Sequence, residues 1–280
     1  KNVFSDLYIN IVRAGEASGT LDIVLYRLAD FLEKQAALTS RVRSALIYPI
    51  FMFVIGGGVL FFTMTYVIPR ISKIFEDSDK ALPTMTVILI SISSFFSSHI
   101  LLLLIALPIL LFGAFRFYKT ERGKMIFDRL SLKLPIFGKI SSMVMISRFT
   151  RTLGTLLASG IPLLDALTIG EAVMGNKVYS EALEEVRDNV REGASLAKPL
   201  KDSGVFPPLV TRMVAVGEQT GEMEEMLTKV ADIYDQQVET MVSTLTSLLE
   251  PVMIVIIGAI MGFIVFAVLL PIFSLTSTIG

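Results

Sequence analysis

The sequence predicts an all-α polytopic membrane protein with three transmembrane helices and two repeated cytoplasmic helical-bundle modules, the first of them truncated here. Three observations predict this fold class. Of 280 residues, 53% are hydrophobic and 18% charged, and the mean hydropathy of +0.68 exceeds that of ordinary soluble domains. Three long stretches lack Asp, Glu, Lys and Arg. The first part of the chain also recurs near its end at a constant offset of 202 residues, so that position 15 returns at 217.

The repeat is clearest in a motif framed by glycines. Residues 15–19, GEASG, return without a gap as residues 217–221, GEQTG. The same offset relates Pro49 to Pro251. Each copy runs from a polar helical segment into a long apolar one, so the repeated unit is a helical module that continues into a membrane-spanning helix.

Residues 1–47 match only the C-terminal part of the second module. Under the offset of 202, the counterpart of Arg148 would lie before residue 1. We therefore expect the chain to be a truncated or partly ordered version of a longer protein, with the first part of its first module missing.

The apolar stretches place the predicted spans. Positions 44–69 carry no charge, and these 26 residues would rise about 39 Å as a helix, more than a bilayer core requires. The predicted order is a transmembrane helix at 48–71, a periplasmic loop or interfacial helix at 72–94, a second span at 95–117, a third at 251–275 and a short periplasmic tail at 276–280.

Basic residues predict the orientation of the spans. Seven Lys and Arg residues lie between positions 116 and 139, whereas the cations of the 72–94 loop and its edge are balanced by acids. By the positive-inside rule the loop faces the periplasm, so both modules lie in the cytoplasm. The basic segment should also favour anionic membrane lipid.

Residues 118–250 read as the second cytoplasmic helical module, which begins with this basic juxtamembrane linker. Helix breaks are predicted at Gly160 with Pro162, at 174–176, at Gly193 and at 207–208. Apolar residues at three- and four-residue steps predict that the last helix runs directly into the membrane. No segment alternates with period two, which disfavours a sheet.

The sequence offers little chemistry. It has no Cys and one histidine, His99, with no metalloprotease histidine pair and no phosphate-binding loop of the Gly-x-x-x-x-Gly-Lys type. We predict no catalytic residue, no cofactor and no metal, and we interpret His99 as an interfacial polar residue. The spans also lack the ionisable residues that ion-coupled carriers need.

The repeated acidic corner has two interpretations. Glu16 and Glu218 could help to cap the following helix while their glycines supply a turn and close packing. Alternatively, these carboxylates meet a protein partner or a cation.

Acidic residues dominate the second module. Between positions 140 and 250 there are 16 acidic and 9 basic residues, a balance of −7. The predicted partner-binding residues are Glu16, Glu218, Glu222, Glu224 and Glu225. The acidic surface as a whole either steers a basic partner surface or is a solvated face without a binding role. Nucleic acid is disfavoured because its phosphates would be repelled.

Glycines at matching depths in the first and third spans predict close helix packing, because a glycine lets two backbones approach. The neighbouring helix belongs either to the same chain or to another protomer. The residues are Gly56, Gly57, Gly58, Gly258 and Gly262.

Together, these motifs resemble the GspF/PilC family of inner-membrane platform proteins from type II secretion and type IV pilus machines. The resemblance rests on GEASG at 15–19, GEQTG at 217–221, LLASGIPLLDAL at 156–167, FPPL at 206–209 and LPIF at 270–273. It covers most of the chain and departs from the family only in the missing first part of the first module.

The resemblance implies a non-enzymatic, multi-pass protein of the bacterial cell inner membrane. Its expected partners are a cytoplasmic hexameric ATPase, pilin or pseudopilin subunits, other inner-membrane assembly proteins and further copies of itself. The alternatives are a membrane transporter or channel subunit with parallel repeats, and a regulator or receptor that signals through its helical body.

Overall fold

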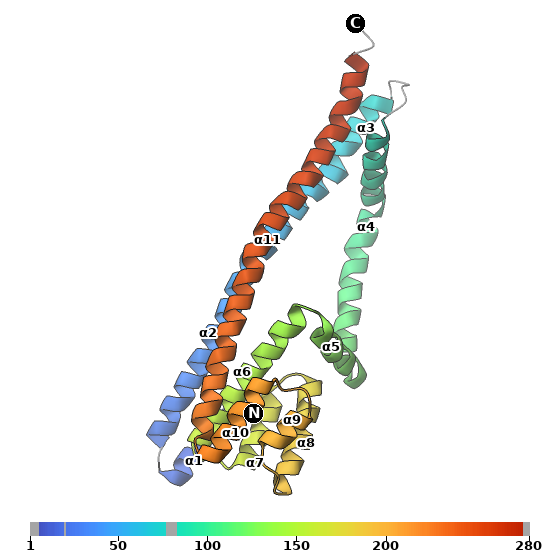
Figure 1. Ribbon diagram of the computed structural model, residues 1–280. Coiled ribbons are helices and arrows are strands. Elements are labelled where there is room, and N and C mark those ends of the chain that lie inside the picture. Colours follow the sequence, from blue (N-terminus) through green and yellow to red (C-terminus); the bar gives the residue numbers. More distant parts are fainter. Residues whose placement is uncertain (1–5, 20, 77–82, 277–280) are drawn as a thin grey trace. The chain divides into compact units, whose positions relative to one another are not determined.

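The computed structural model describes residues 6–19, 21–76 and 83–276, and its regular elements within these ranges are all helices, which confirms the predicted all-α class (Figure 1). In chain order the elements are α1 (Asp6–Ser18), α2 (Leu21–Phe62), the π-helical turn η1 (Thr63–Val67), α3 (Ile68–Glu76), α4 (Thr84–Tyr118), α5 (Glu121–Lys133), α6 (Phe137–Ala158), α7 (Leu163–Val173), α8 (Lys177–Arg191), α9 (Ala197–Asp202), α10 (Pro208–Thr220) and α11 (Met223–Thr276).

The helix breaks lie where turn residues predicted them. Helix α6 ends just before Gly160, and α7 begins after Pro162, whose ring already fixes a backbone angle suited to a helix start. Asn176 caps α8 because its side-chain oxygen accepts a hydrogen bond from the Val178 N–H at 3.0 Å. Helix α11 continues for 54 residues, which confirms that the last helix runs on into the apolar stretch.

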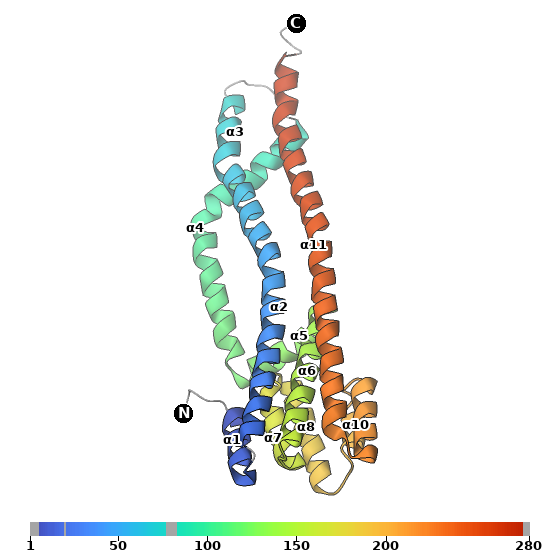
Figure 2. The ribbon, with the colours of Figure 1, turned by 90° about the vertical axis from the view of Figure 1, so that its left-hand side faces the viewer.

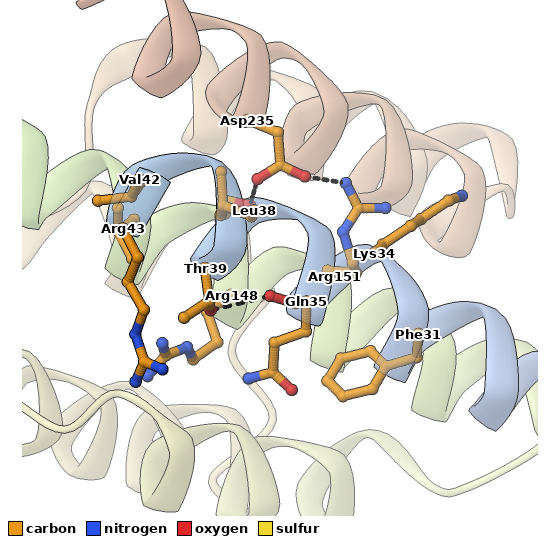
Figure 3. Close-up of a pocket in the computed structure, with 12 residues that line it drawn as sticks. Phe31, Lys34, Gln35, Leu38, Thr39, Val42, Arg43, Arg148, Arg151 and Asp235 are labelled. Atoms are coloured by element: carbon orange, nitrogen blue, oxygen red, sulfur yellow. Dashed lines mark hydrogen bonds and ion pairs between the residues drawn. The ribbon is translucent and has the colours of Figure 1, made fainter. Parts of the chain in front are cut away.

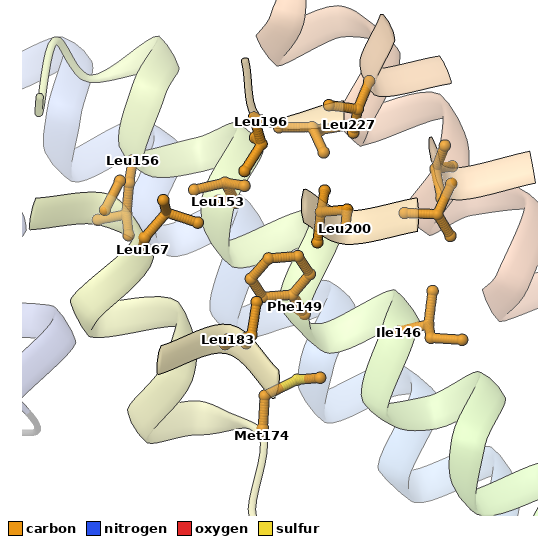
Figure 4. Packing of buried hydrophobic residues seen from close by; sticks show 14 of the residues in the cluster. Ile146, Phe149, Leu153, Leu156, Leu167, Met174, Leu183, Leu196, Leu200 and Leu227 are labelled. Carbon is orange, nitrogen blue, oxygen red and sulfur yellow. The ribbon is translucent and has the colours of Figure 1, made fainter. Parts of the chain in front are cut away.

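The helices form two compact units, one made of Lys1–Arg43 with Phe117–Val242 and one of Ser44–Arg116 with Ser243–Gly280. In the first unit, Phe149 and Leu153 of α6 are fully buried at the centre of the core (Figure 4). Helices α1 and α2 add apolar side chains to the same core, namely Ile11, Val24, Leu28 and Phe31.

The second unit has a small core and an apolar exterior. Its buried cluster consists of Ile68, Leu89, Ile264 and Ala267. Many large apolar side chains are exposed instead, such as Val54 at 67% and Val255 at 68%. A surface of this kind suits lipid better than water.

Within the described residues, two helical stretches are long and apolar enough to cross a membrane, Leu21–Lys73 and Met223–Leu270. Helix α4 contains the predicted second span and is continuous, with apolar segments at Thr84–His99 and Pro108–Tyr118. A third crossing and the domain boundaries therefore stay predictions. Residues 77–82 of the predicted loop and 277–280 of the predicted tail lie outside the described residues.

Polar side chains in the second unit bond to backbone carbonyls. The Thr86 hydroxyl of α4 donates to the carbonyl of Ala267 at 2.6 Å. The Ser93 hydroxyl donates to the carbonyl of Met64 in η1, where the Ile68 N–H bonds to Thr63, five residues back. These bonds join α4 to α11 and to η1.

Helices α2 and α11 lie side by side within each unit (Figures 1 and 2). In the first unit, Arg41 pairs with Glu239 at 2.6 Å. In the second, the Tyr48 hydroxyl donates to Glu250 at 3.4 Å, and these two residues are separated by the repeat offset of 202. The repeated helices thus run next to each other.

Candidate functional site

The corner around Glu218 lies between the end of α10 and the start of α11. Gly221 has φ +78°, the left-handed conformation that glycine adopts without strain, and its N–H donates to the Gly217 carbonyl at 2.9 Å. A Cβ at Gly217 would lie 2.8 Å from the Cα of Met223. The two glycines therefore permit a sharp turn and a close approach of the two helices.

The Glu218 carboxylate points into the protein. Its two oxygens accept hydrogen bonds from the backbone N–H groups of Leu196 and Ala197, the latter at 3.2 Å. These groups begin α9 and have no partner within that helix. The carboxylate thus caps α9 and joins α9 to α10. The motif alone had suggested a cap of the following helix, α11, instead.

Replacing Glu218 with glutamine is expected to lower the free energy of unfolding by about 1–2 kcal/mol, because one of the two acceptor oxygens becomes a donor facing an N–H group. The apparent Tm of the full chain in neutral detergent, followed by circular dichroism, measures the effect. Glu222→Gln is the matched control, since Glu222 is exposed. An unchanged Tm for Glu218→Gln would contradict the capping role.

The first copy of the motif has the same backbone geometry. Helix α1 ends at Ser18, Gly19 has φ +70°, and a Cβ at Gly15 would lie 3.1 Å from the Cα of Leu21. Glu16 is exposed, and no hydrogen bond or ion pair within the described ranges reaches its carboxylate. The residues that would correspond to Leu196 and Ala197 fall before residue 1.

The other three predicted partner residues gather at the start of α11. Glu222, Glu224 and Glu225 are all exposed, and Glu225 pairs with Lys229 at 2.7 Å. Acidic residues at this end stabilise the helix through its dipole. The structure thus brings Glu222, Glu224 and Glu225 to one exposed acidic corner. The Glu218 carboxylate is instead hydrogen-bonded to the start of α9, and Glu16 lies in the first copy of the motif.

A second acidic surface lies along α8. Its carboxylates surround a shallow depression of about 350 Å³ and belong to Glu181, Glu184, Glu185, Asp188 and Glu192. Two arginines of the same helix are bound by acids, Arg187 by Glu171 at 2.6 Å and Arg191 by Asp188 at 3.1 Å. The depression therefore stays acidic and suits a basic partner surface.

Of the five glycines predicted to pack helices, Gly56 meets a neighbouring helix. A Cβ there would lie 2.7 Å from the Ile257 side chain of α11. Gly57 borders an apolar groove of about 630 Å³ between α2, α4 and α11. No atom of another element lies within 4 Å of a Cβ built at Gly57, Gly58, Gly258 or Gly262 among the described residues.

The sequence did not predict an ionic cluster around the buried Arg151. The Arg151 side chain, 8% exposed, donates to Asp235 at 2.5 Å (Figure 3) and to Asp232 at 2.7 Å. The Ser147 hydroxyl also donates to Asp235. Burial acts to lower the pKa of Arg151, but the hydrogen bonds and charges of the two aspartates outweigh it and raise this pKa. The guanidinium is thus a permanent cation that binds α6 to α11.

The chain is similar to proteins of bacterial secretion and pilus assembly. The family described as type II secretion system (T2SS), protein F, matches residues 1–69 and 149–271. The type IV pilus assembly protein PilC of Thermus thermophilus is 42% identical over 280 residues, covering 99% of this chain and 69% of that protein. PilC of Myxococcus xanthus is 37% identical over 277 residues, covering 99% and 66%. The type II secretion system protein F of Vibrio cholerae is 36% identical over 276 residues, covering 99% and 68%.

Proposed function

The chain belongs to the type II secretion system protein F family, and on this premise we propose that it is a non-enzymatic platform of the bacterial inner membrane. In this role it couples a cytoplasmic hexameric ATPase to the extraction and assembly of pilin or pseudopilin subunits. The names of its relatives, from both pilus assembly and type II secretion, support the proposal. The chain spans about two thirds of the length of these relatives, so the activity of the whole protein is part of the proposal.

The proposed architecture has cytoplasmic modules at 1–47 and 118–250, and spans at 48–71, 95–117 and 251–275. The equal offset between α1 and α10, and between the starts of α2 and α11, supports a duplicated module. One family description matches a segment in each half of the chain. Two copies of the same polarity can share a side of the membrane only if a return crossing separates them, and α4 supplies it.

The observation that carries the proposal is the continuity of α11. Its first turn bears the exposed acidic residues Glu224 and Glu225, and the same helix continues into the apolar stretch that begins at Pro251. A continuous helix transmits a displacement at one end to the other, because each turn is hydrogen-bonded to the next. A partner that binds the acidic corner can thus act on the membrane part, and the energy can come from that partner.

A site-specific crosslink tests the proposal. The chain has no cysteine, so Glu225→Cys provides a single attachment point for a benzophenone maleimide in native membranes. We expect the label to react from the cytoplasmic side and to crosslink to the hexameric ATPase, with yield falling as salt rises. Lys198→Cys on α9, which is also exposed, is the matched control and is expected to give little product.

Three results would count against the platform. The first is labelling of the 1–47 and 118–250 modules from opposite sides of the membrane. The second is nucleotide hydrolysis by the purified chain alone. The third is solute flux through liposomes that contain only this protein, which would favour a transporter or channel subunit. Crosslinking of other inner-membrane assembly proteins, or of a second copy, is compatible with the proposal.

A further inference from the structure

The first unit contains a cavity of about 240 Å³ between α2, α6 and α11 (Figure 3). A single water needs only about 10–15 Å³ of such space, so the cavity admits a larger group. Apolar side chains, including Phe31 and Leu38, form part of its wall. Four cationic side chains and one carboxylate also line it: Lys34, Arg43, Arg148, Arg151 and Asp235.

Two of these cationic side chains form ion pairs with acidic side chains of the protein. Lys34 pairs with Asp30 at 3.1 Å. Arg151 holds Asp235, which leaves that carboxylate little capacity to attract another cation. The remaining two, Arg43 and Arg148, form no hydrogen bond or ion pair with any residue that the structure describes. Both are directed to the same side of the cavity in Figure 3.

Arg148 is half-buried and Arg43 is exposed, and the two guanidiniums border the same cavity without an acidic partner among the residues that the structure describes. Like charges that share a site repel each other unless an anion lies between them. Planar guanidiniums also match the oxygens of a phosphate, to which each can donate two parallel hydrogen bonds. The half-buried Gln35 lines the same cavity and adds an amide donor.

We propose that Arg43 and Arg148, with Gln35, form a phosphate-binding site at the cytoplasmic edge of the membrane. Arg43 is the last charged residue of α2 before the uncharged positions 44–69, so its side chain lies within about one helical turn of the start of the apolar stretch. Phospholipid phosphates occupy this depth. Free phosphate has the same chemistry and is the other possible source. This inference rests on the proposed cytoplasmic position of residues 1–47 and is independent of the proposed coupling to an ATPase.

The test uses the full chain in neutral detergent, titrated with phosphatidylglycerol or with inorganic phosphate. Arg43→Gln with Arg148→Gln is expected to weaken binding of the phosphate probe at least about tenfold, because two charge-assisted contacts are lost. The control pair, Arg41→Gln with Arg212→Gln, removes the same charge from exposed residues that do not line the cavity. It is expected to change binding by less than about twofold.

A third variant separates charge from geometry. Arg43→Lys with Arg148→Lys keeps both charges but removes the planar forks, and intermediate binding is expected. Circular dichroism of each variant without a probe establishes whether it is folded. If the double glutamine variant is not folded, the binding affinity of the double lysine variant decides whether the site exists.

The outcomes identify the source of the phosphate. A loss confined to phosphatidylglycerol assigns the site to a lipid headgroup, and a loss for inorganic phosphate as well assigns it to phosphate in general. Equal weakening by the control pair, or no binding of either probe to the original chain, would overturn the proposal. An acidic peptide serves as a third probe, and a loss of binding by the glutamine pair confined to that peptide would also overturn the proposal, because it would make the cavity a protein-docking site.

Discussion

Replacing Arg151 with methionine is expected to lower the free energy of unfolding by about 3 kcal/mol, because the change leaves Asp235 half-buried without its cation. The arginine side chain is 8% exposed and that of Asp235 is 24% exposed, so water replaces little of the lost interaction. Asp232 contributes less, since its side chain is 58% exposed. Thermal unfolding of the full chain in detergent, followed by circular dichroism at several urea concentrations, measures the loss.

Arg191→Met is the control for this prediction. Arg191 also pairs with an aspartate, Asp188, but its side chain is 62% exposed, and exposed pairs contribute about 0–1 kcal/mol. A second variant, Arg151→Met with Asp235→Asn, removes both charges and should recover part of the stability. Equal effects of Arg151→Met and Arg191→Met would show that burial of the cluster does not matter.

Truncating Phe149 to alanine is expected to destabilise the first unit by about 3–5 kcal/mol. The ring is fully buried (Figure 4), and its centroid lies 5.5 Å from that of Phe206. A Cβ at Gly170 of α7 would lie 3.1 Å from the Phe149 ring. The glycine thus lets α7 approach the ring, and its loss would leave a cavity that the backbone cannot readily fill.

The same helix supplies a matched control for Phe149. Phe137 begins α6 and is 68% exposed, so Phe137→Ala removes the same atoms from the surface. We expect that change to alter stability by less than about 0.5 kcal/mol. Resistance to limited proteolysis between α6 and α10 gives an independent measure, and comparable digestion of the two variants would contradict the assigned core.

The sequence predicted what depends on nearby residues. Helix breaks at Pro162 and Asn176 follow from local backbone preferences, and the continuity of α11 follows from its apolar steps without a turn residue. The repeat also anticipated the shared geometry of Gly15 and Gly217, because the same backbone turn requires the same glycine.

Contacts between residues far apart in the sequence could not be predicted from local sequence patterns. Glu218 lies between a glycine and polar residues, a pattern typical of an exposed turn, and nothing nearby indicates that it caps a helix that begins 21 residues earlier. Arg151 and Asp235 are 84 residues apart. One signal was present, since Asp30 and Asp232 share the repeat offset, but the sequence does not say which cation each one binds.

The π-helical turn at Thr63–Val67 acts as a one-residue insertion in the winding of the helical stretch Leu21–Lys73, which is long and apolar enough to cross a membrane. Removing one residue from this turn would restore α-helical winding and rotate everything after it by about 100° around the helix axis. Ile68, now 2% exposed against Leu89, would leave its place between the helices. The extra residue therefore sets the rotational position of α3 about the helix axis, and with it the direction in which Arg70 and Lys73 face.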